Sequence, residues 1–158
     1  MARPFPWKCR NCGHQAVRPK VLNYEADMEH DGRLYSLAVP NLEILECDAC
    51  HNRTLPDAAL RRIVDQLRAK AELLTPEEIR EQRLRLGLTQ EEFAKLLRVA
   101  EETVSRWESE NQIPKRAMND FMEVLFNVPE AREFLKNRRG MGVKAERFGD
   151  ATAPLGGL

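Results

Sequence analysis

Four cysteines in two matched pairs are the residues whose types and spacing most directly suggest chemistry in this sequence. Cys9 and Cys12 form one Cys-x-x-Cys pair, Cys47 and Cys50 form a second, and 34 residues separate the two pairs. Each pair places two sulfur atoms within reach of one ion, and two pairs complete the tetrahedral thiolate site that suits zinc. Because four thiolates fill the coordination shell, we expect a structural zinc ion rather than a catalytic one.

Redox or disulfide chemistry and an iron site are the alternatives for these cysteines. A redox Cys-x-x-Cys lies at the start of a helix within a βαβ unit, and neither pair has such neighbours. His14 and His51 adjoin the pairs and are alternative ligands, but with four cysteines present we expect both of them, and His30, at the surface. Gly13 follows the first pair and accepts the positive φ that a metal-binding loop needs.

Composition and charge narrow the class of protein. The chain has 158 residues, 42% hydrophobic and 32% charged, which suits one or two small globular domains. The sequence has no apolar run of about 20 residues that would span a membrane and no apolar segment near Met1 typical of a signal peptide. We therefore expect a cytoplasmic protein, where thiols stay reduced. The net charge is zero, and residues 75–137 hold 10 Lys/Arg and 13 Asp/Glu, a net charge of −3, so non-specific affinity for nucleic acid should be weak.

A second informative stretch runs over residues 88–113 and predicts two short helices joined by a tight turn. Thr89 can cap the first helix, and Glu92, three residues further on, completes the capping-box pattern. The apolar residues of this helix share one face, namely Phe93, Ala94 and Leu97.

The second helix of this stretch begins near Glu101. Val104 and Trp107 are three residues apart and turn one side of the helix toward the core, so we interpret Trp107 as a core residue. At about 100° per residue, the opposite side points outward. It carries the polar residues Glu102, Ser105, Arg106 and Ser109.

These two segments, residues 88–94 and 103–108, resemble the Cro/phage-repressor (XRE) helix-turn-helix family. The alternative is an ordinary helical hairpin in a bundle, which would not explain capping, core and exposed positions in one register. Two positions depart from the family pattern: Ala100 leaves the second helix without its usual side-chain cap, and Glu110-Asn111 replaces a glycine. We expect Asn111 to adopt the left-handed conformation there.

The exposed polar face supplies the candidate DNA contacts. Arg106 can donate two hydrogen bonds to O6 and N7 of guanine, and Glu102 can accept one from N4 of cytosine. The alternative is a solvated salt bridge between these two residues, worth only about 0.2–0.5 kcal/mol. Further candidate contacts to bases or phosphates are Gln90, Glu101, Thr103 and Ser105.

The first 56 residues predict a small antiparallel sheet around the cysteines. We expect strands over 16–24, 34–39 and 42–47, and a break of the ladder at Pro40. A polar segment over 27–33 contains the turn signal Asp31-Gly32. Residues 57–74 predict a connector helix capped by Asp57. Its apolar stripe comprises Leu60, Ile63, Val64, Leu67 and Ala71.

Residues 75–137 predict a domain of five helices, the first beginning with Thr75 as cap and Pro76 at the first position. Residues 138–158 are rich in glycine and show no pattern, so we expect a flexible tail. The predicted fold class is therefore α+β: a small antiparallel β zinc-ribbon-like lobe (1–56), a connector helix (57–74), and an all-α five-helix XRE-type helix-turn-helix domain (75–137).

The order of these parts over residues 5–137 resembles the MqsA (YgiT-type) antitoxin family, with Val39-Pro40 before the second cysteine pair and Leu55-Pro56 before the connector helix. The resemblance implies a zinc lobe that binds a toxin protein and a C-terminal domain that dimerises on a palindromic operator and represses its own operon. The alternative is a stand-alone XRE-family regulator whose zinc lobe is structural or senses a metal or ligand. We expect no enzyme, because the sequence shows no Ser/His/Asp set, phosphate-binding loop or histidine–carboxylate metal triad.

Overall fold

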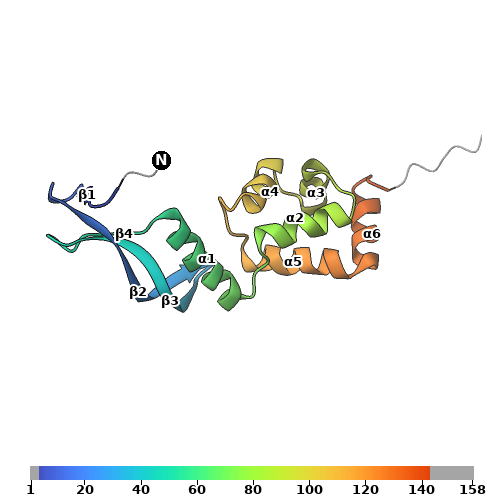
Figure 1. Ribbon diagram of the computed structural model, residues 1–158. Helices are drawn as coiled ribbons and strands as arrows, with labels where there is room; N and C mark the ends of the chain where they lie inside the picture. The colour runs from blue at the N-terminus through green and yellow to red at the C-terminus, as the bar shows by residue number, and fades with distance from the viewer. Residues whose placement is uncertain (1–3, 143–158) are drawn as a thin grey trace, which may run out of the picture.

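A computed structural model describes residues 4–142, and in this range an antiparallel four-stranded sheet precedes six helices. The sheet has the order β1-β2-β3-β4, and the helices α2 to α6 form a separate bundle (Figure 1). The predicted α+β class is confirmed, whereas most of the predicted tail lies outside the described residues. The strands are β1 (Trp7–Lys8), β2 (Gln15–His30), β3 (Arg33–Cys47) and β4 (Arg53–Thr54). The helices are α1 (Asp57–Ala71), α2 (Pro76–Arg85), α3 (Gln90–Leu97), α4 (Glu101–Glu108), α5 (Arg116–Asn127) and α6 (Pro129–Arg138).

Strands β2 and β3 form one long hairpin that pairs from Val17↔Cys47 to His30↔Arg33. Asp31 and Gly32 make the turn with φ of 50° and 73°, which is the double positive φ of a tight two-residue hairpin turn. The predicted turn signal at Asp31-Gly32 is therefore confirmed, but the polar residues before it belong to a strand, because β2 continues to His30. Half-buried and exposed residues alternate along β2 from Val21 to His30, so the polar residues Glu25, Asp27 and Glu29 occupy the outward face of the strand.

Pro40 does not end the strand as predicted, since β3 runs without interruption from Arg33 to Cys47. The pairing instead shifts register between Leu22 and Tyr24 of β2. Asn41 takes a φ of 49° at this irregularity. The freed carbonyl oxygens of Pro40 and Asn41 each accept a 2.7 Å hydrogen bond from Arg62 on α1, so the bulge also attaches the connector helix to the sheet.

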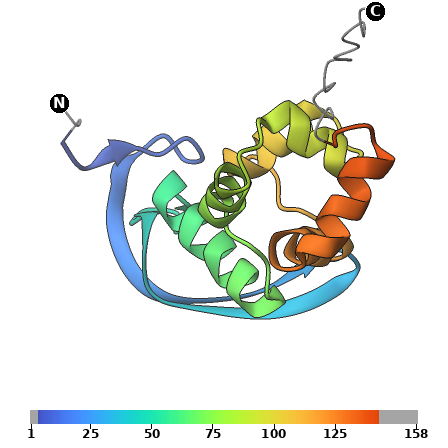
Figure 2. The same ribbon diagram turned by 90° about the vertical axis from the view of Figure 1, so that its right-hand side faces the viewer.

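Helix α1 packs on β3, and Figure 2 shows the long hairpin curving around it. Its buried face consists of Ala59, Ile63 and Leu67. Leu60 is 45% exposed, so the predicted stripe was wrong at this position. Asp57 is the first helical residue rather than the cap. Its carboxylate lies in the first turn, where a negative charge interacts favourably with the helix dipole.

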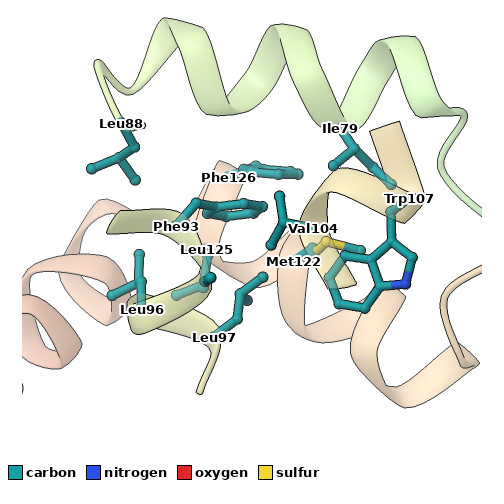
Figure 3. Packing of buried hydrophobic residues seen from close by; sticks show 11 residues of the cluster. Ile79, Leu88, Phe93, Leu96, Leu97, Val104, Trp107, Met122, Leu125 and Phe126 are labelled. Atoms are coloured by element: carbon teal, nitrogen blue, oxygen red, sulfur yellow. The ribbon is translucent and has the colours of Figure 1, made fainter. Parts of the chain in front are cut away.

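The five helices α2 to α6 enclose the second core, shown in Figure 3. Phe93, Leu96, Val104, Met122 and Leu125 are completely or almost completely buried there. Trp107 is buried too, as predicted. The side chains of α4 that enter this core leave only its opposite face available for a ligand.

The predicted helix starts are confirmed at Thr75 and Thr89, which both form complete capping boxes. Ala100 precedes α4 without a side-chain capping bond from any described residue, as expected. The left-handed residue after α4 is Glu110, with φ of 64°, and not Asn111.

A buried ion pair connects α2 with α4. Arg83 donates to both carboxylate oxygens of Glu108, over 2.6 and 2.9 Å, and to the carbonyl oxygen of Leu88 over 2.7 Å. The side chains of Arg83 and Glu108 are 8% and 5% exposed. This pair therefore holds the C-terminal end of α4 against α2 in a site with little solvent screening.

Polar contacts also join the sheet lobe to the helical bundle. The buried Asn119 of α5 accepts a 2.8 Å hydrogen bond from the amide of Leu74. His30 at the tip of the hairpin lies 3.1 Å from the carbonyl oxygen of Pro114. It is half-buried, so the expectation of a surface His30 was wrong. These contacts hold the start of α5 against the segment after α1 and the segment before α5 against the tip of the hairpin.

Replacing Glu108 with Gln should destabilise the chain by about 3–5 kcal/mol, because the Arg83 guanidinium would remain buried without its counter-charge. Urea unfolding followed by far-UV circular dichroism measures this loss. The paired replacement Arg83→Met with Glu108→Leu should recover most of it, since neither buried charge remains.

The pH dependence of unfolding provides the control. Burial raises the pKa of Glu108, but hydrogen bonds from Arg83 and Gln90 outweigh it and hold that pKa below its usual 4.5. The stabilisation is therefore present above pH 4.5 and is lost as the pH falls through the lower folded-state pKa. Equal acid sensitivity of wild type and Glu108→Gln would contradict this role.

Candidate metal centre and nucleic-acid interface

The four cysteine sulfur atoms gather at one end of the sheet and lie within 4.8 Å of one another. The Sγ atoms of Cys9 and Cys50 are 3.7 Å apart, as are those of Cys12 and Cys47. Cys9 and Cys47 are buried, and the other two are half-buried. The predicted grouping of all four residues is thus present, and it can hold one metal ion.

The two metal-binding loops repeat the same backbone design. The amide of Gly13 donates to the carbonyl of Cys9, and the amide of His51 donates to the carbonyl of Cys47. Gly13 and His51 occupy equivalent positions, four residues after the first cysteine of each pair, and both take positive φ. The His51 side chain is 78% exposed, so this histidine serves the loop through its backbone, and His14 is exposed as well.

The thiols differ in how readily they lose a proton. A hydrogen bond from the Asn11 side chain and one from the Asn52 backbone lower the pKa of Cys50 to about 6. The His14 backbone lowers the pKa of Cys12, but burial and the neighbouring thiols outweigh it and raise that pKa to about 12. Cys50 therefore forms a thiolate more readily than Cys12, whose proton must be displaced when a cation binds.

Glu46 was not recognised from the sequence, although it anchors the strands beside the cysteines. Its carboxylate is 4% exposed and pairs with Lys20 on β2 and with Arg53 on β4, the latter over 2.7 Å. Hydrogen bonds from Lys20 and Arg53 lower the pKa of Glu46 to about 2. This ionised carboxylate ties three strands together at the end of the sheet that carries the metal centre.

The polar face of α4 is the second candidate site. Glu101, Glu102, Ser105 and Arg106 are all exposed, and Thr103 is half-buried. Val104 and Trp107 on the other face are buried. In Figure 1, α3 and α4 lie together on one side of the bundle and α5 on the other, so the predicted contact residues of α4 face away from the bundle.

Gln90, the first residue of α3, lies beside α4. Its side-chain amide donates a 2.9 Å hydrogen bond to Glu108, which itself pairs with Arg83. Gln90 is therefore positioned next to α4 by the same carboxylate that attaches α4 to α2. Within residues 4–142 there is no ion pair between Glu102 and Arg106, so the alternative of a solvated salt bridge does not engage the Arg106 guanidinium.

Arg83 was missed in the sequence, although a signal was present. It follows Ile79 by four residues and therefore lies on the inward face of α2. A charged residue at such a position requires a buried partner, and Glu108 is that partner.

Comparison with known families is consistent with this geometry. Residues 79–130 match the family described as helix-turn-helix, a range that begins in α2 and ends in α6. This segment is thus a DNA-binding domain of the XRE type, and its presence indicates a DNA-binding regulator. A search of curated proteins finds no match to the chain. Among the described residues, no helix has the length and apolar character needed to cross a membrane.

Removing bound metal with a chelator should unfold the sheet lobe while the helical bundle stays folded. The lobe's core consists mainly of side chains from β3 and α1, and the cysteine end is stabilised mainly by its ligands. Amide hydrogen exchange measured residue by residue distinguishes the two parts. Cys47→Ser should reproduce the chelated state. His51→Asn should retain the metal, because asparagine also tolerates positive φ. If the protection of β1 and β4 against exchange is unchanged by chelation, the ion has no role in folding.

Proposed function

We propose that this chain is a sequence-specific transcriptional regulator that binds a palindromic operator as a homodimer and acts as the antitoxin and autorepressor of a type II toxin–antitoxin pair in the cytoplasm. The observation that carries the DNA-binding part is the exposed polar face of α4, which has no ion pair between Glu102 and Arg106. The antitoxin part rests on the resemblance of the whole arrangement to the MqsA type.

Arg106 is the proposed principal base contact. Its guanidinium is exposed, and a bidentate pair with guanine contributes about 1–3 kcal/mol of discrimination against other bases. Its own carbonyl oxygen accepts hydrogen bonds from the amides of Asn111 and Gln112, over 3.0 and 3.2 Å. The backbone that carries Arg106 is therefore restrained by the turn that follows α4.

The remaining proposed contacts divide by chemistry. Glu102 would accept a hydrogen bond from cytosine N4, and Ser105 would bond either a base or a phosphate. Gln90, Glu101 and Thr103 lie at or near the N-terminal ends of α3 and α4. Helix N-termini attract phosphate through their unpaired amides, so we assign Gln90 and Thr103 to the DNA backbone and Glu101 to the margin of the interface.

A basic cluster near α3 supports binding to phosphates despite the negative charge of the domain. Burial is the main cause that lowers the pKa of Arg139, and the nearby positive charges of Arg98 and Arg138 lower it further. Arg139 also donates to the carbonyl of Lys95. These cations supply the local positive charge that non-specific attraction to DNA requires.

The homodimer is proposed from the symmetry of palindromic sites, whose halves lie about 34 Å apart on one face of DNA. Exposed apolar side chains on the bundle away from α4 offer a surface for it: Val124 of α5, Val128, and Phe134 of α6, which is 60% exposed. Burying these side chains between two copies would remove apolar surface from water.

Zinc is the proposed ion at the cysteines. Zn–S bonds of about 2.3 Å imply tetrahedral S–S edges of about 3.8 Å, and the Sγ–Sγ distances of the pairs Cys9–Cys50 and Cys12–Cys47 are 3.7 Å. The proposed domain limits are those of the sequence: the zinc lobe at 1–56, the connector helix at 57–74, and the reader domain at 75–137.

Arg106→Ala should abolish the preference for the operator over random DNA while leaving the fold and the metal content unchanged. The operator is first obtained by selecting oligonucleotides on the metal-loaded protein, and affinities are then compared at one salt concentration. Arg106→Lys should keep non-specific binding but also lose the preference, because lysine lacks the bidentate fork.

Arg80→Ala is the matched control, since it removes one exposed positive charge from α2. It should retain the operator preference of the wild type. Equal operator preference in Arg106→Ala and wild type would contradict the assigned role.

The antitoxin part is tested by expressing the chain together with the product of its neighbouring gene. A toxin partner should co-purify with the metal-loaded chain and dissociate after Cys47→Ser, because the proposed toxin-binding surface depends on the folded lobe. Co-purification with Arg106→Ala should be unaffected. If no neighbouring product is retained while operator binding is intact, the chain is instead a stand-alone regulator.

A further inference from the structure

A groove of about 440 Å³ lies between α1 and the turn that follows α4. One wall is a single face of α1, and the other wall is the turn over Ser109, Glu110 and Asn111. In Figure 1 the segment that follows α4 descends on the side of the bundle that faces α1. A volume of this size suits a small organic ligand.

Arg68 lines this groove and is an unusual residue for a buried position. It is 3% exposed, and its one ion pair among residues 4–142 is a 3.3 Å contact from Nη1 to the exposed Asp65. Its Nε and Nη2 atoms are buried and have no hydrogen-bond partner among residues 4–142. A buried guanidinium with unpaired donors is costly, so its retention requires an explanation.

The unpaired atoms have a specific geometry. Nε and Nη2 lie on the same edge of the guanidinium, and their two N–H groups point in parallel. This edge matches the two oxygens of a carboxylate, which arginine binds through a pair of parallel hydrogen bonds. The chemistry at this end of the groove therefore favours a carboxylate.

The rest of the α1 wall is largely apolar. Leu60 and Val64 line the groove between Arg68 and Asp57, and the twelve residues from Asp57 to Arg68 extend about 16 Å along a helix. Arg61 pairs with Glu110 of the opposite wall over 3.8 Å, so these two charges neutralise each other. An elongated ligand with one carboxylate and an apolar chain fits this arrangement.

We propose that this groove binds a small carboxylic acid with an apolar chain, which lies along Leu60 and Val64. Because Nε and Nη2 of Arg68 each have less than 1 Å² of accessible surface, the Arg68 side chain turns toward the groove to pair these two atoms with the carboxylate. Helix geometry explains the position of the Leu60 and Val64 side chains, since the face that packs on the sheet carries Ala59 and Ile63, and the neighbouring face carries Leu60 and Val64.

Binding at this groove has a direct route to α4. The amides of Asn111 and Gln112 donate to the carbonyl of Arg106, and Glu110 holds a left-handed φ of 64°. A ligand that contacts this turn and α1 together therefore acts on the end of α4. In this respect the inference rests on the proposed function, and we expect ligand binding to change the affinity for DNA.

The test uses the full metal-loaded chain and calorimetric titration with octanoate, with octanamide as the uncharged probe of similar shape. Octanoate should bind the wild type at least about tenfold more tightly than octanamide, as expected for charge-assisted hydrogen bonds. Arg68→Leu should lose this preference, and Lys70→Leu, which removes a neighbouring positive charge from α1, should keep it. Equal binding of the two probes to the wild type, or no octanoate binding, would overturn the proposal.

A melting measurement on Arg68→Leu and one further variant guard against a merely structural effect. Arg68→Leu should melt at a temperature no lower than the wild type without ligand, because an unpaired buried charge is replaced by an apolar group. A lower melting temperature would assign Arg68 to the fold instead. Val64→Phe keeps Arg68 but fills the groove, so it should also lose octanoate; retained binding would place the ligand elsewhere.

A DNA-binding assay with and without octanoate then tests the coupling. The operator affinity of the wild type should shift with octanoate, and that of Arg68→Leu should not. If no duplex is bound at all, the proposed function fails while the calorimetric result still decides the groove. If octanoate binds but operator affinity is unchanged, the coupling to α4 is wrong.

Discussion

The burial of Val104 and Trp107 beside the Arg83–Glu108 ion pair determines how α4 is presented to its surroundings. The two apolar side chains fix which face of the helix turns inward, and the ion pair attaches its C-terminal end to α2. Because an eight-residue helix is too short to be stable alone, its orientation depends on these contacts. The polar face that carries Arg106 is a consequence of this packing, as is the position of Gln90, which shares Glu108.

The sheet lobe also needs contacts beyond its own backbone pairing to hold its elements in place. Its hairpin is long but narrow, and only one face of β3 is covered by α1. The ends of the hairpin are therefore held by polar groups: the cysteines and Glu46 at one end, and His30 and Asp31 against the bundle at the other. Helix α1 stands between these parts, with one face on the sheet and a neighbouring face on the groove beside the turn after α4.

Local patterns allowed much of this structure to be predicted. The cysteine spacing, the two capping boxes and the inward pair of α4 depend on residues close together in the sequence, and each was found where expected. The long-range features were not predicted. The Arg83–Glu108 pair joins residues 25 apart, and His30 meets Pro114 across 84 residues. The polar residues over 27–30 were not predicted to belong to a strand, but pairing with β3 extended β2 to His30, because an outward strand face accepts charge.

The central claim is that the polar face of α4 enters the major groove of an operator. Methylation interference tests it most directly, because a methyl group on guanine N7 projects into the major groove, where Arg106 is proposed to bind. Our account predicts that methylation at one guanine in each half of the palindrome prevents binding, and that this effect disappears in Arg106→Ala. Operator binding that tolerates N7 methylation at every guanine, yet is blocked by methylation at adenine N3 in the minor groove, would contradict it.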